Sequence, residues 1–326
     1  RHYPAMREWM GYVERYMKDG LLTRWPDTPY RDWFLGDWLA PHGVDTGSEA
    51  SVSLVNNCFV SDCYARMAQM ARLTGHDDEA AAFEARREAL NRTIHARFYD
   101  PATQTYATGS QLDMTYPMLV GATPDSLRAG VEQRLFRLTH DVMKDHIGGG
   151  LVGVPVITRW AVRSHNPEFI YRMLKQRGYP GYLHMIDHGA TATWEYWSGE
   201  RSRVHNCYNG IGTWFYQALG GLRTDSSHPG YEHVFIDPQI PEGVEWCRIG
   251  KETPYGRIDL GWEIADGELR IDVTLPPGVT ATAITPAGAC RGRLDGRRLA
   301  PQSPGTKIAS GRHRLVFGLA PQNERQ

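Results

Sequence analysis

Glu195 is the carboxylate whose neighbours in this sequence best suit acid–base chemistry. It lies in the segment Thr193-Trp-Glu-Tyr-Trp197, in a stretch without helical or strand periodicity. A carboxyl group there could exchange a proton with a reacting group, which accelerates reactions by roughly 10²–10⁴-fold. The competing interpretation is a structural glutamate that pairs with Arg201 or Arg203 on the same loop, and the residues alone leave both open.

Aromatic and acidic residues gather in three segments that are too polar to form a core, residues 25–39, 178–197 and 201–209. A sugar ring has apolar C–H faces that stack on aromatic side chains, and hydroxyls that need polar partners. Any one tryptophan in these segments is better explained by core packing. Four tryptophans that each lie near an acid nevertheless favour a carbohydrate site when taken together: Trp33, Trp38, Trp194 and Trp197.

The order and spacing of these motifs resemble the α-L-rhamnosidases of glycoside hydrolase family 78. Residues 193–197, the segment around His205 and Gly212-Thr-Trp-Phe-Tyr216 are similar to the family's T-x-W-E-x-W, N-H-type and G-x-W-x-Y segments. Three further segments match the family in order: Gly36-Asp-Trp-Leu39, Gly149-Gly-Leu-Val-Gly-Val-Pro155 and Tyr179-Pro-Gly-Tyr-Leu-His-Met185. The likeness extends to residues 236–239 and 254–257, so it covers nearly the whole chain.

This resemblance implies an (α/α)6 barrel followed by a β-sandwich, and hydrolysis of terminal α-L-rhamnosides with inversion. By position, Glu195 matches the family's general base, which activates water. The substrate-binding candidates are Asp37, Trp38, His205, Trp194 and Trp197, with Trp33 added from the aromatic cluster. The expected partner is a rhamnose-containing oligosaccharide, polysaccharide or glycoside.

One part of the family pattern is missing. The family's general acid lies in a D-x-x-x-R-x-E-x-x-G-W-x-G-D-type segment upstream of G-D-W-L, and neither Glu8 nor Asp32 lies in a comparable segment. About eight helices precede the β-rich region, fewer than the twelve of a complete barrel. The chain also begins at Arg1 without an initiator methionine. We therefore expect it to be part of a longer protein whose preceding sequence supplies the acid.

Two other functions fit the same residues. A sugar-binding pseudoenzyme would keep the aromatic pocket but lack an acid. Another (α/α)6 enzyme, such as an unsaturated glucuronyl hydrolase or a polysaccharide lyase, would act on a uronate with a cationic clamp, for which Arg31, Arg201 and Arg203 are candidates. A second carboxyl group roughly 6.5–9.5 Å from Glu195 would distinguish an inverting hydrolase from a binding protein.

Residues 1–225 are predicted to be the helical scaffold that positions these segments. Apolar residues three and four apart predict helices over residues 2–18, around 55–73 and over 77–98, and Thr123-Pro124 predicts another to about 142. Similar patterns fit residues 111–120, 151–163, 167–177 and 207–219. Paired helices with long loops on one side indicate an α/α barrel or solenoid whose long loops form the working face.

Residues 226–326 are predicted to form an accessory antiparallel β-sandwich. Apolar and polar residues alternate over residues 257–264 and 269–275, on either side of an Asp266-Gly267 turn. Residues 280–285 and 314–317 read as further strands. The predicted fold class is therefore mainly α with a C-terminal all-β domain, namely an incomplete (α/α)6 barrel followed by an antiparallel β-sandwich.

Composition and spacing argue against several other classes of protein. A formal net charge of -1 provides no general attraction to nucleic acid or anionic membrane, and no segment reaches the roughly 20 apolar residues that span a bilayer. His184 and His188 lie in a loop rich in Gly and Pro without further zinc-like spacing, so we expect no metal. No phosphate loop and no nucleophile elbow are present, which argues against a nucleotide site and against a serine nucleophile, and we expect no cofactor. The five scattered cysteines do not indicate a disulfide framework, and neither compartment nor oligomeric state follows from the sequence.

Overall fold

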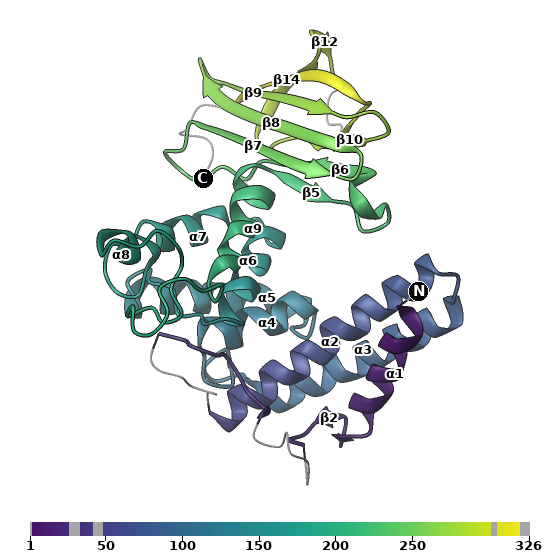
Figure 1. Ribbon diagram of the computed structural model, residues 1–326, viewed down its shortest axis with the longest axis vertical. Helices are drawn as coiled ribbons and strands as arrows, with labels where there is room; N and C mark the ends of the chain where they lie inside the picture. Colours follow the sequence, from purple (N-terminus) through teal and green to yellow (C-terminus); the bar gives the residue numbers. More distant parts are fainter. Residues whose placement is uncertain (1, 26–32, 42–47, 301–304, 320–326) are drawn as a thin grey trace. The chain divides into compact units, whose positions relative to one another are not determined.

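The computed structural model describes residues 2–25, 33–41, 48–300 and 305–319. The chain divides into two compact units, one formed by Arg1–Arg163 with Phe169–Ile211 and the other by Ser164–Glu168 with Gly212–Gln326. The first unit is helical and the second consists mainly of β-strands (Figure 1). The prediction of a helical part followed by an all-β part is therefore confirmed.

Helices make up most of the chain before residue 190. They are α1 (Tyr3–Glu14), α2 (Glu49–Leu73), α3 (Asp77–Phe98), α4 (Gln111–Val120), α5 (Asp125–Arg137), α6 (Gly153–Arg163), α7 (Pro167–Leu174) and α8 (Tyr182–Asp187). A π-helical turn, Leu138–Val142, extends α5. Two short hairpins follow α1 and α3, namely β1 (Met17–Lys18) with β2 (Leu21–Leu22) and β3 (Tyr99–Asp100) with β4 (Thr105–Tyr106). No helix in the described part of the chain is long and apolar enough to cross a membrane.

Local sequence explains where the first helices begin and end. The side chain of Ser48 caps α2 by accepting a hydrogen bond from the backbone N–H of Ser51 at 3.2 Å. The helix predicted over residues 2–18 is too long, since α1 ends at Glu14. Asp19 and Gly20 both have positive φ and form the tight turn between β1 and β2, so residues 17–22 pair as a hairpin instead.

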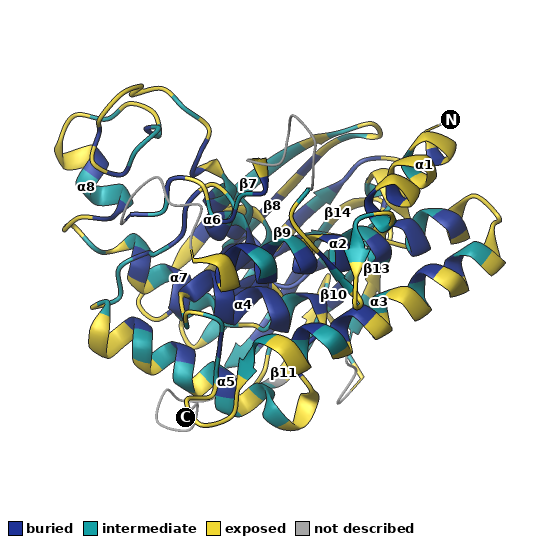
Figure 2. Ribbon diagram, turned by 90° about the horizontal axis from the view of Figure 1, so that it is seen from below, coloured by how far each residue is buried: buried dark blue, intermediate teal, exposed yellow. Residues whose placement is uncertain are grey.

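Helix α4 is the most buried helix of the first unit. Its described residues are buried from Gln111 to Met118, and Figure 2 shows its ribbon in the colour of buried residues. A helix that is buried on all sides lies in the interior, where its polar side chains need hydrogen-bond partners. Its buried carboxylate, Asp113, accepts hydrogen bonds from the hydroxyls of Ser51 and Thr108 at 2.7 and 2.5 Å, which compensate for its burial.

The continuous helix predicted over residues 207–219 is absent. A 3-10 turn (Asn209–Ile211), a single α turn (Gly212–Trp214, α9) and a π-helical turn (Phe215–Leu219) replace it. At Gly210, a Cβ atom would lie 2.8 Å from the Cβ of Pro155, so only glycine fits this close approach. The backbone N–H of Gly220 donates to the carbonyl of Phe215 at 2.8 Å, five residues back, and closes the π turn.

The β unit contains two sheets. Its strands are β5 (Leu222–Thr224), β6 (His233–Ile236), β7 (Trp246–Thr253), β8 (Gly256–Ala265), β9 (Glu268–Leu275), β10 (Thr280–Ile284), β11 (Ala289–Leu294), β12 (Arg297–Arg298), β13 (Gly305–Ile308) and β14 (Gly311–Leu319). The six-stranded sheet has the order β12-β11-β14-β9-β8-β7 and is antiparallel throughout. In the four-stranded sheet, β13-β10-β6-β5, the pairing of β6 with β10 is parallel and the other two pairings are antiparallel.

Alternating side chains fill the core of the β unit. The predicted strands over residues 257–264 and 269–275 correspond to β8 and β9, and Asp266 and Gly267 have the positive φ that their tight turn requires. Their inward residues are buried with those of β14 in one apolar cluster that includes Trp262, Ile271 and Phe317. The outward residues of the same strands are mostly charged, as expected of a sheet with one solvated face.

Candidate active site

Glu195 lies on an irregular loop between α8 and the turn at Asn209. Its backbone N–H donates to the carbonyl of Ser202 at 2.8 Å, and its carboxylate accepts from the backbone N–H of Ser202 at 3.3 Å. The side chain is partly exposed, and in the described residues its other oxygen, Oε1, accepts no hydrogen bond. One carboxylate oxygen is therefore held while the other is open to a water or a ligand.

The arginines that could neutralise Glu195 have other contacts. The guanidinium of Arg201 lies over the ring of Tyr196, 5.5 Å from its centroid, and that of Arg203 lies 5.1 Å from the ring of Trp194. Neither forms an ion pair with Glu195 among the residues that the structure describes. The structural ion pair weighed as an alternative is therefore not formed. The third cationic candidate, Arg31, lies outside the described residues.

Tyr208 joins the Glu195 loop to the segment that contains Asp37. Its ring is buried and stacks on Trp197 with the centroids 4.0 Å apart and the planes at 21°. Its hydroxyl lies 3.1 Å from the carbonyl oxygen of Glu195 and 2.9 Å from that of Leu39. Sequence reasoning missed this residue, because a tyrosine three positions after His205 carries no local sign of such a long-range contact.

Asp37 caps the beginning of α6. Its carboxylate accepts backbone N–H bonds from Gly150 at 2.7 Å, Val152 at 3.0 Å and Gly153 at 2.8 Å. A helix N-terminus offers unpaired N–H groups and a partial positive charge, so a carboxylate is well placed there. Burial raises the pKa of Asp37 to about 6, and the three backbone donors oppose that rise. Both oxygens of this predicted sugar contact are therefore engaged by the protein itself.

The glycines of residues 148–153 allow this contact. A Cβ atom at Gly150 would lie 2.1 Å from the carbonyl oxygen of Trp38, and one at Gly153 would lie 2.4 Å from Oδ2 of Asp37. The backbone N–H of Leu151 also donates to the Trp38 carbonyl at 2.7 Å. The two motifs around Asp37 and Gly150, 113 residues apart in the chain, thus form one structural element.

The four tryptophans have different environments. Trp197 is buried and donates its indole N–H to the carbonyl of Gly149 at 3.0 Å, and Trp194 is buried against Gly199. These two rings offer no exposed face for the predicted stacking on a sugar, because packing beneath the Glu195 loop covers them. Trp33 and Trp38 are 69% and 36% exposed and remain available to a ligand.

His205 is held on the same loop as Glu195. Its backbone N–H donates to the carbonyl of Thr193 at 2.8 Å, and the Thr193 hydroxyl donates to the His205 carbonyl at 2.5 Å. Its Nδ1 accepts from the backbone N–H of Cys207 at 3.2 Å, so the ring proton of the neutral form lies on Nε2 and can be donated to a ligand. Burial, and second the nearby Glu195 carboxylate, raise the pKa of Cys207 to about 11, which keeps this thiol protonated.

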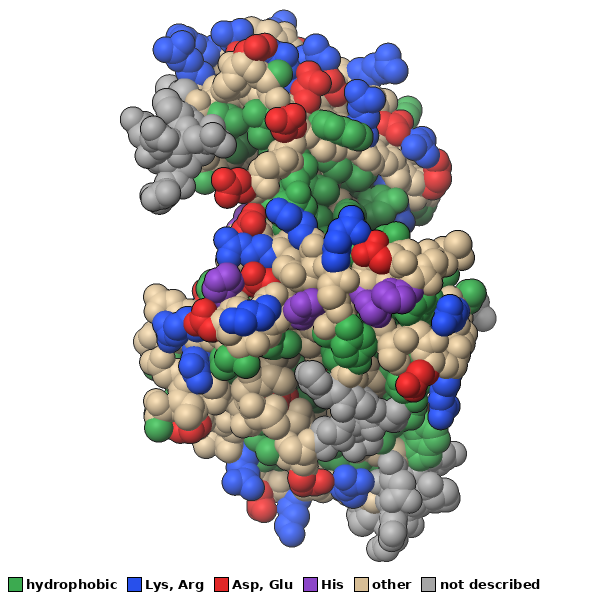
Figure 3. All heavy atoms as spheres, turned by 90° about the vertical axis from the view of Figure 1, so that its left-hand side faces the viewer, with side chains coloured by type: hydrophobic (Ala, Val, Ile, Leu, Met, Phe, Trp, Pro, Cys, Tyr) green, Lys and Arg blue, Asp and Glu red, His purple; other side chains and the backbone are tan. Residues whose placement is uncertain are grey.

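The pair His184 and His188 lies on a helix end rather than in a loop. His184 belongs to α8, and His188 caps its C-terminus with the two rings 4.2 Å apart. Figure 3 shows histidines among acidic and basic side chains on the face of the helical unit that carries α8. The described residues contain no group of three or more His, Cys, Asp or Glu that could hold a metal ion.

Models of two protein domains match this chain. The model of the bacterial alpha-L-rhamnosidase 6 hairpin glycosidase domain matches residues 1–219, and that of the bacterial alpha-L-rhamnosidase C-terminal domain matches residues 221–297. The chain belongs to the bacterial α-L-rhamnosidase family. The resemblance to the α-L-rhamnosidases of glycoside hydrolase family 78 is thereby confirmed.

Curated relatives are longer than this chain. The α-L-rhamnosidase of Alteromonas sp. (strain LOR) is 24% identical over 303 residues, which are 87% of this chain and 32% of the relative. One from Formosa agariphila is 23% identical over 86% of this chain and 30% of its own length. The chain therefore spans about a third of the length of these α-L-rhamnosidases.

Solved structures share the fold at low sequence identity. The Streptomyces avermitilis α-L-rhamnosidase complexed with L-rhamnose has a TM-score of 0.82 at 22% identity, covering 96% of this chain and 30% of that one. The enzyme from Dictyoglumus thermophilum has a TM-score of 0.84 at 17% identity, covering 97% and 36%. A family 78 rhamnosidase of Bacillus sp. GL1 also matches, with a TM-score of 0.63.

Proposed function

We propose that this chain is the C-terminal part of an inverting glycosidase that hydrolyses terminal α-L-rhamnosides, with Glu195 as the general base. The observation that carries the proposal is the state of the Glu195 carboxylate. One oxygen accepts the Ser202 N–H and Oε1 accepts no hydrogen bond from the part of the chain that the structure describes, while Tyr208 anchors the loop backbone. Such a carboxylate can accept a proton from a water molecule without first breaking an ion pair.

Inversion needs a water molecule and a second carboxyl group. The base removes a proton from water as it attacks the anomeric carbon, while an acid protonates the departing glycosidic oxygen roughly 6.5–9.5 Å away. Since the chain spans about a third of its relatives, we propose that the acid and the remaining barrel helices come from the part of the protein that this chain does not span.

The other site residues would bind the sugar before the reaction. The Nε2–H group of His205 can donate to a sugar hydroxyl, and the exposed rings of Trp33 and Trp38 can stack on its C–H faces. Asp37 would act indirectly, by fixing the Trp38 segment on the N-terminus of α6. The substrate would thus be a rhamnose-containing oligosaccharide, polysaccharide or glycoside.

Product stereochemistry tests this proposal. The whole protein is incubated with p-nitrophenyl α-L-rhamnoside in an NMR tube, and the first rhamnose anomer is recorded before mutarotation. We expect β-L-rhamnose in the wild type, and a kcat lowered roughly 10²–10⁴-fold in Glu195→Gln. First formation of the α anomer would contradict inversion. Rhamnose binding without turnover in the wild type would instead favour the sugar-binding pseudoenzyme.

A further inference from the structure

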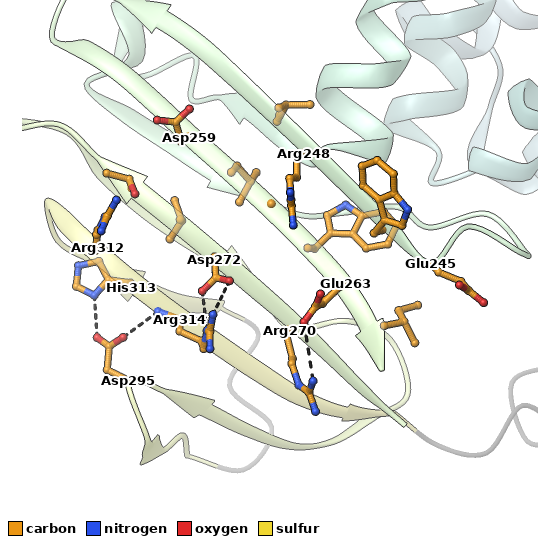
Figure 4. Close-up of a pocket in the computed structure, with 18 residues that line it drawn as sticks. Glu245, Arg248, Asp259, Glu263, Arg270, Asp272, Asp295, Arg312, His313 and Arg314 are labelled. Atoms are coloured by element: carbon orange, nitrogen blue, oxygen red, sulfur yellow. Dashed lines mark hydrogen bonds and ion pairs between the residues drawn. The ribbon is translucent and has the colours of Figure 1, made fainter. Parts of the chain in front are cut away.

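The outer face of the six-stranded sheet contains a hollow outside the Glu195 site. Its volume is about 920 Å³, and residues of β7, β8, β9 and β14 line it within the β unit (Figure 4). This volume lies within the range of about 300–1,000 Å³ that is common for small-molecule sites. We propose that this hollow is a second carbohydrate-binding site, which takes a neutral oligosaccharide.

A row of residues across four strands forms its floor. The pairing of the strands places Arg248 beside Gly261, Gly261 beside Asp272, and Asp272 beside Arg314. Because Gly261 has no side chain, the row is open between Arg248 and Asp272, two strand spacings or roughly 9–10 Å apart. A Cβ atom at Gly261 would lie 3.3 Å from Cγ of Arg248, so the arginine stem already occupies one side of this gap.

An exposed tryptophan borders the hollow at the edge strand. Trp246 is 66% exposed and lies two residues before Arg248 on β7, so both side chains point to the same face of the sheet. The outward face of an antiparallel sheet is ordinarily polar, and an indole that is 66% exposed there gains little from folding. A ring with a free face beside hydrogen-bonding groups is instead suited to the C–H face of a sugar.

The charged groups of the hollow are balanced in sign. Five carboxylates and four guanidinium groups line it, which gives no net attraction for a polyanion or a polycation. Asp272 and Arg314 form a two-pronged ion pair at 2.6 and 2.8 Å, whereas Arg248 and Arg312 have no polar partner among the described residues. These two free guanidinium groups can donate to hydroxyl oxygens, and the paired carboxylates can accept from hydroxyl hydrogens. A neutral, hydroxyl-rich ligand matches that set.

The second site rests on the proposed function in one respect, namely the choice of a rhamnose oligosaccharide as the probe. The experiment is calorimetric titration of the whole protein carrying Glu195→Gln with a neutral α-linked tetrarhamnoside. Because the Glu195 site also binds terminal rhamnosides, the titration is fitted with two sites, and Trp246→Ala should raise the Kd of one of them at least about tenfold by removing the exposed aromatic contact. Arg248→Ala should raise the same Kd about two- to tenfold. Trp246→Tyr should leave the Kd close to that of the Glu195→Gln protein, because tyrosine keeps an aromatic face.

Matched controls lie in the helical unit. Trp9, 54% exposed on α1, is changed to Ala as the control for an exposed indole, and Arg92 on α3 is changed to Ala as the control for a surface arginine. Both should leave the Kd unchanged. The proposal is overturned if Trp246→Ala and Arg248→Ala bind like the controls, or if polygalacturonate binds more tightly than the tetrarhamnoside. A failed Glu195 assignment would show as hydrolysis of the tetrarhamnoside by the Glu195→Gln protein, which chromatography of the titrated sample detects, whereas failure of the hollow shows only in the Kd.

Discussion

The hydroxyl of Tyr208 lies 2.9 Å from the carbonyl oxygen of Leu39 and 3.1 Å from that of Glu195. A phenol has one O–H proton, so at any moment it donates to one of these carbonyls, while the other also lies within hydrogen-bond distance. Since the ring is buried against Trp197, the hydroxyl has little freedom to move. Tyr208 therefore connects the proposed base to the segment that Asp37 anchors.

Removal of this hydroxyl should affect catalysis as well as stability. Tyr208→Phe removes the one donor that the carbonyls of Leu39 and Glu195 share, which we expect to cost about 1–3 kcal/mol and to lower kcat more than it changes KM. Tyr182→Phe is the matched control, because its hydroxyl donates to the Tyr208 carbonyl at 2.8 Å without touching Glu195. Urea unfolding and rhamnoside kinetics are compared. Equal losses of kcat in both variants would show that Tyr208 is merely structural.

Asp37 should make stability depend on pH. The pKa of Asp37 is about 6 in the folded protein, against an ordinary value of 3.8. Between pH 3.8 and about 6, the folded state therefore binds more protons than the unfolded state. The free energy of unfolding should therefore fall as pH rises from about 4 to 6, by up to roughly 3 kcal/mol.

The measurement is urea unfolding of the wild type and of Asp37→Asn at several pH values. Asparagine does not titrate, so the stability advantage of the wild type over the variant should shrink across this window. An advantage that grows with pH would show that the three N–H donors of α6 outweigh burial and lower the pKa of Asp37 instead.

Local patterns predicted the regular elements well and the site geometry less well. The bounds of α3 and α4 match the predicted ranges, because the acidic first turn of α3 and the cap of α4 are local signals. The break after Cys207 depends on the approach of Pro155 to Gly210, and the parallel pairing of β6 with β10 joins segments far apart in the chain. Neither leaves a periodic trace in the sequence.

The roles of the aromatic residues show the same division. The motif predicted that the tryptophans near Glu195 line the sugar site. The residue type alone does not reveal which of these rings are buried and which are exposed. Trp194 and Trp197 lie beneath the loop, whereas Trp38 retains an exposed surface. Asp37 was predicted to contact sugar, yet it meets amides more than 110 residues away in the chain.

This difference between covered and exposed tryptophans can be measured. Trp197→Ala should destabilise the helical unit by about 3–5 kcal/mol, because it empties a buried ring site and removes the bond to Gly149. Trp38→Ala should change stability by less than about 1 kcal/mol and raise KM for the rhamnoside. Thermal unfolding and initial-rate kinetics separate the two effects. A KM unchanged in Trp38→Ala would remove that ring from the proposed sugar site.

The most direct test of Glu195 as the base is chemical rescue. In Glu195→Ala of the whole protein, turnover of p-nitrophenyl α-L-rhamnoside should fall roughly 10²–10⁴-fold, because water is no longer activated. Azide needs no base and fits the space of the lost carboxylate, so added azide should restore release of p-nitrophenol and yield β-L-rhamnosyl azide. Undiminished turnover in Glu195→Ala, or an α-configured azide product, would contradict the assignment.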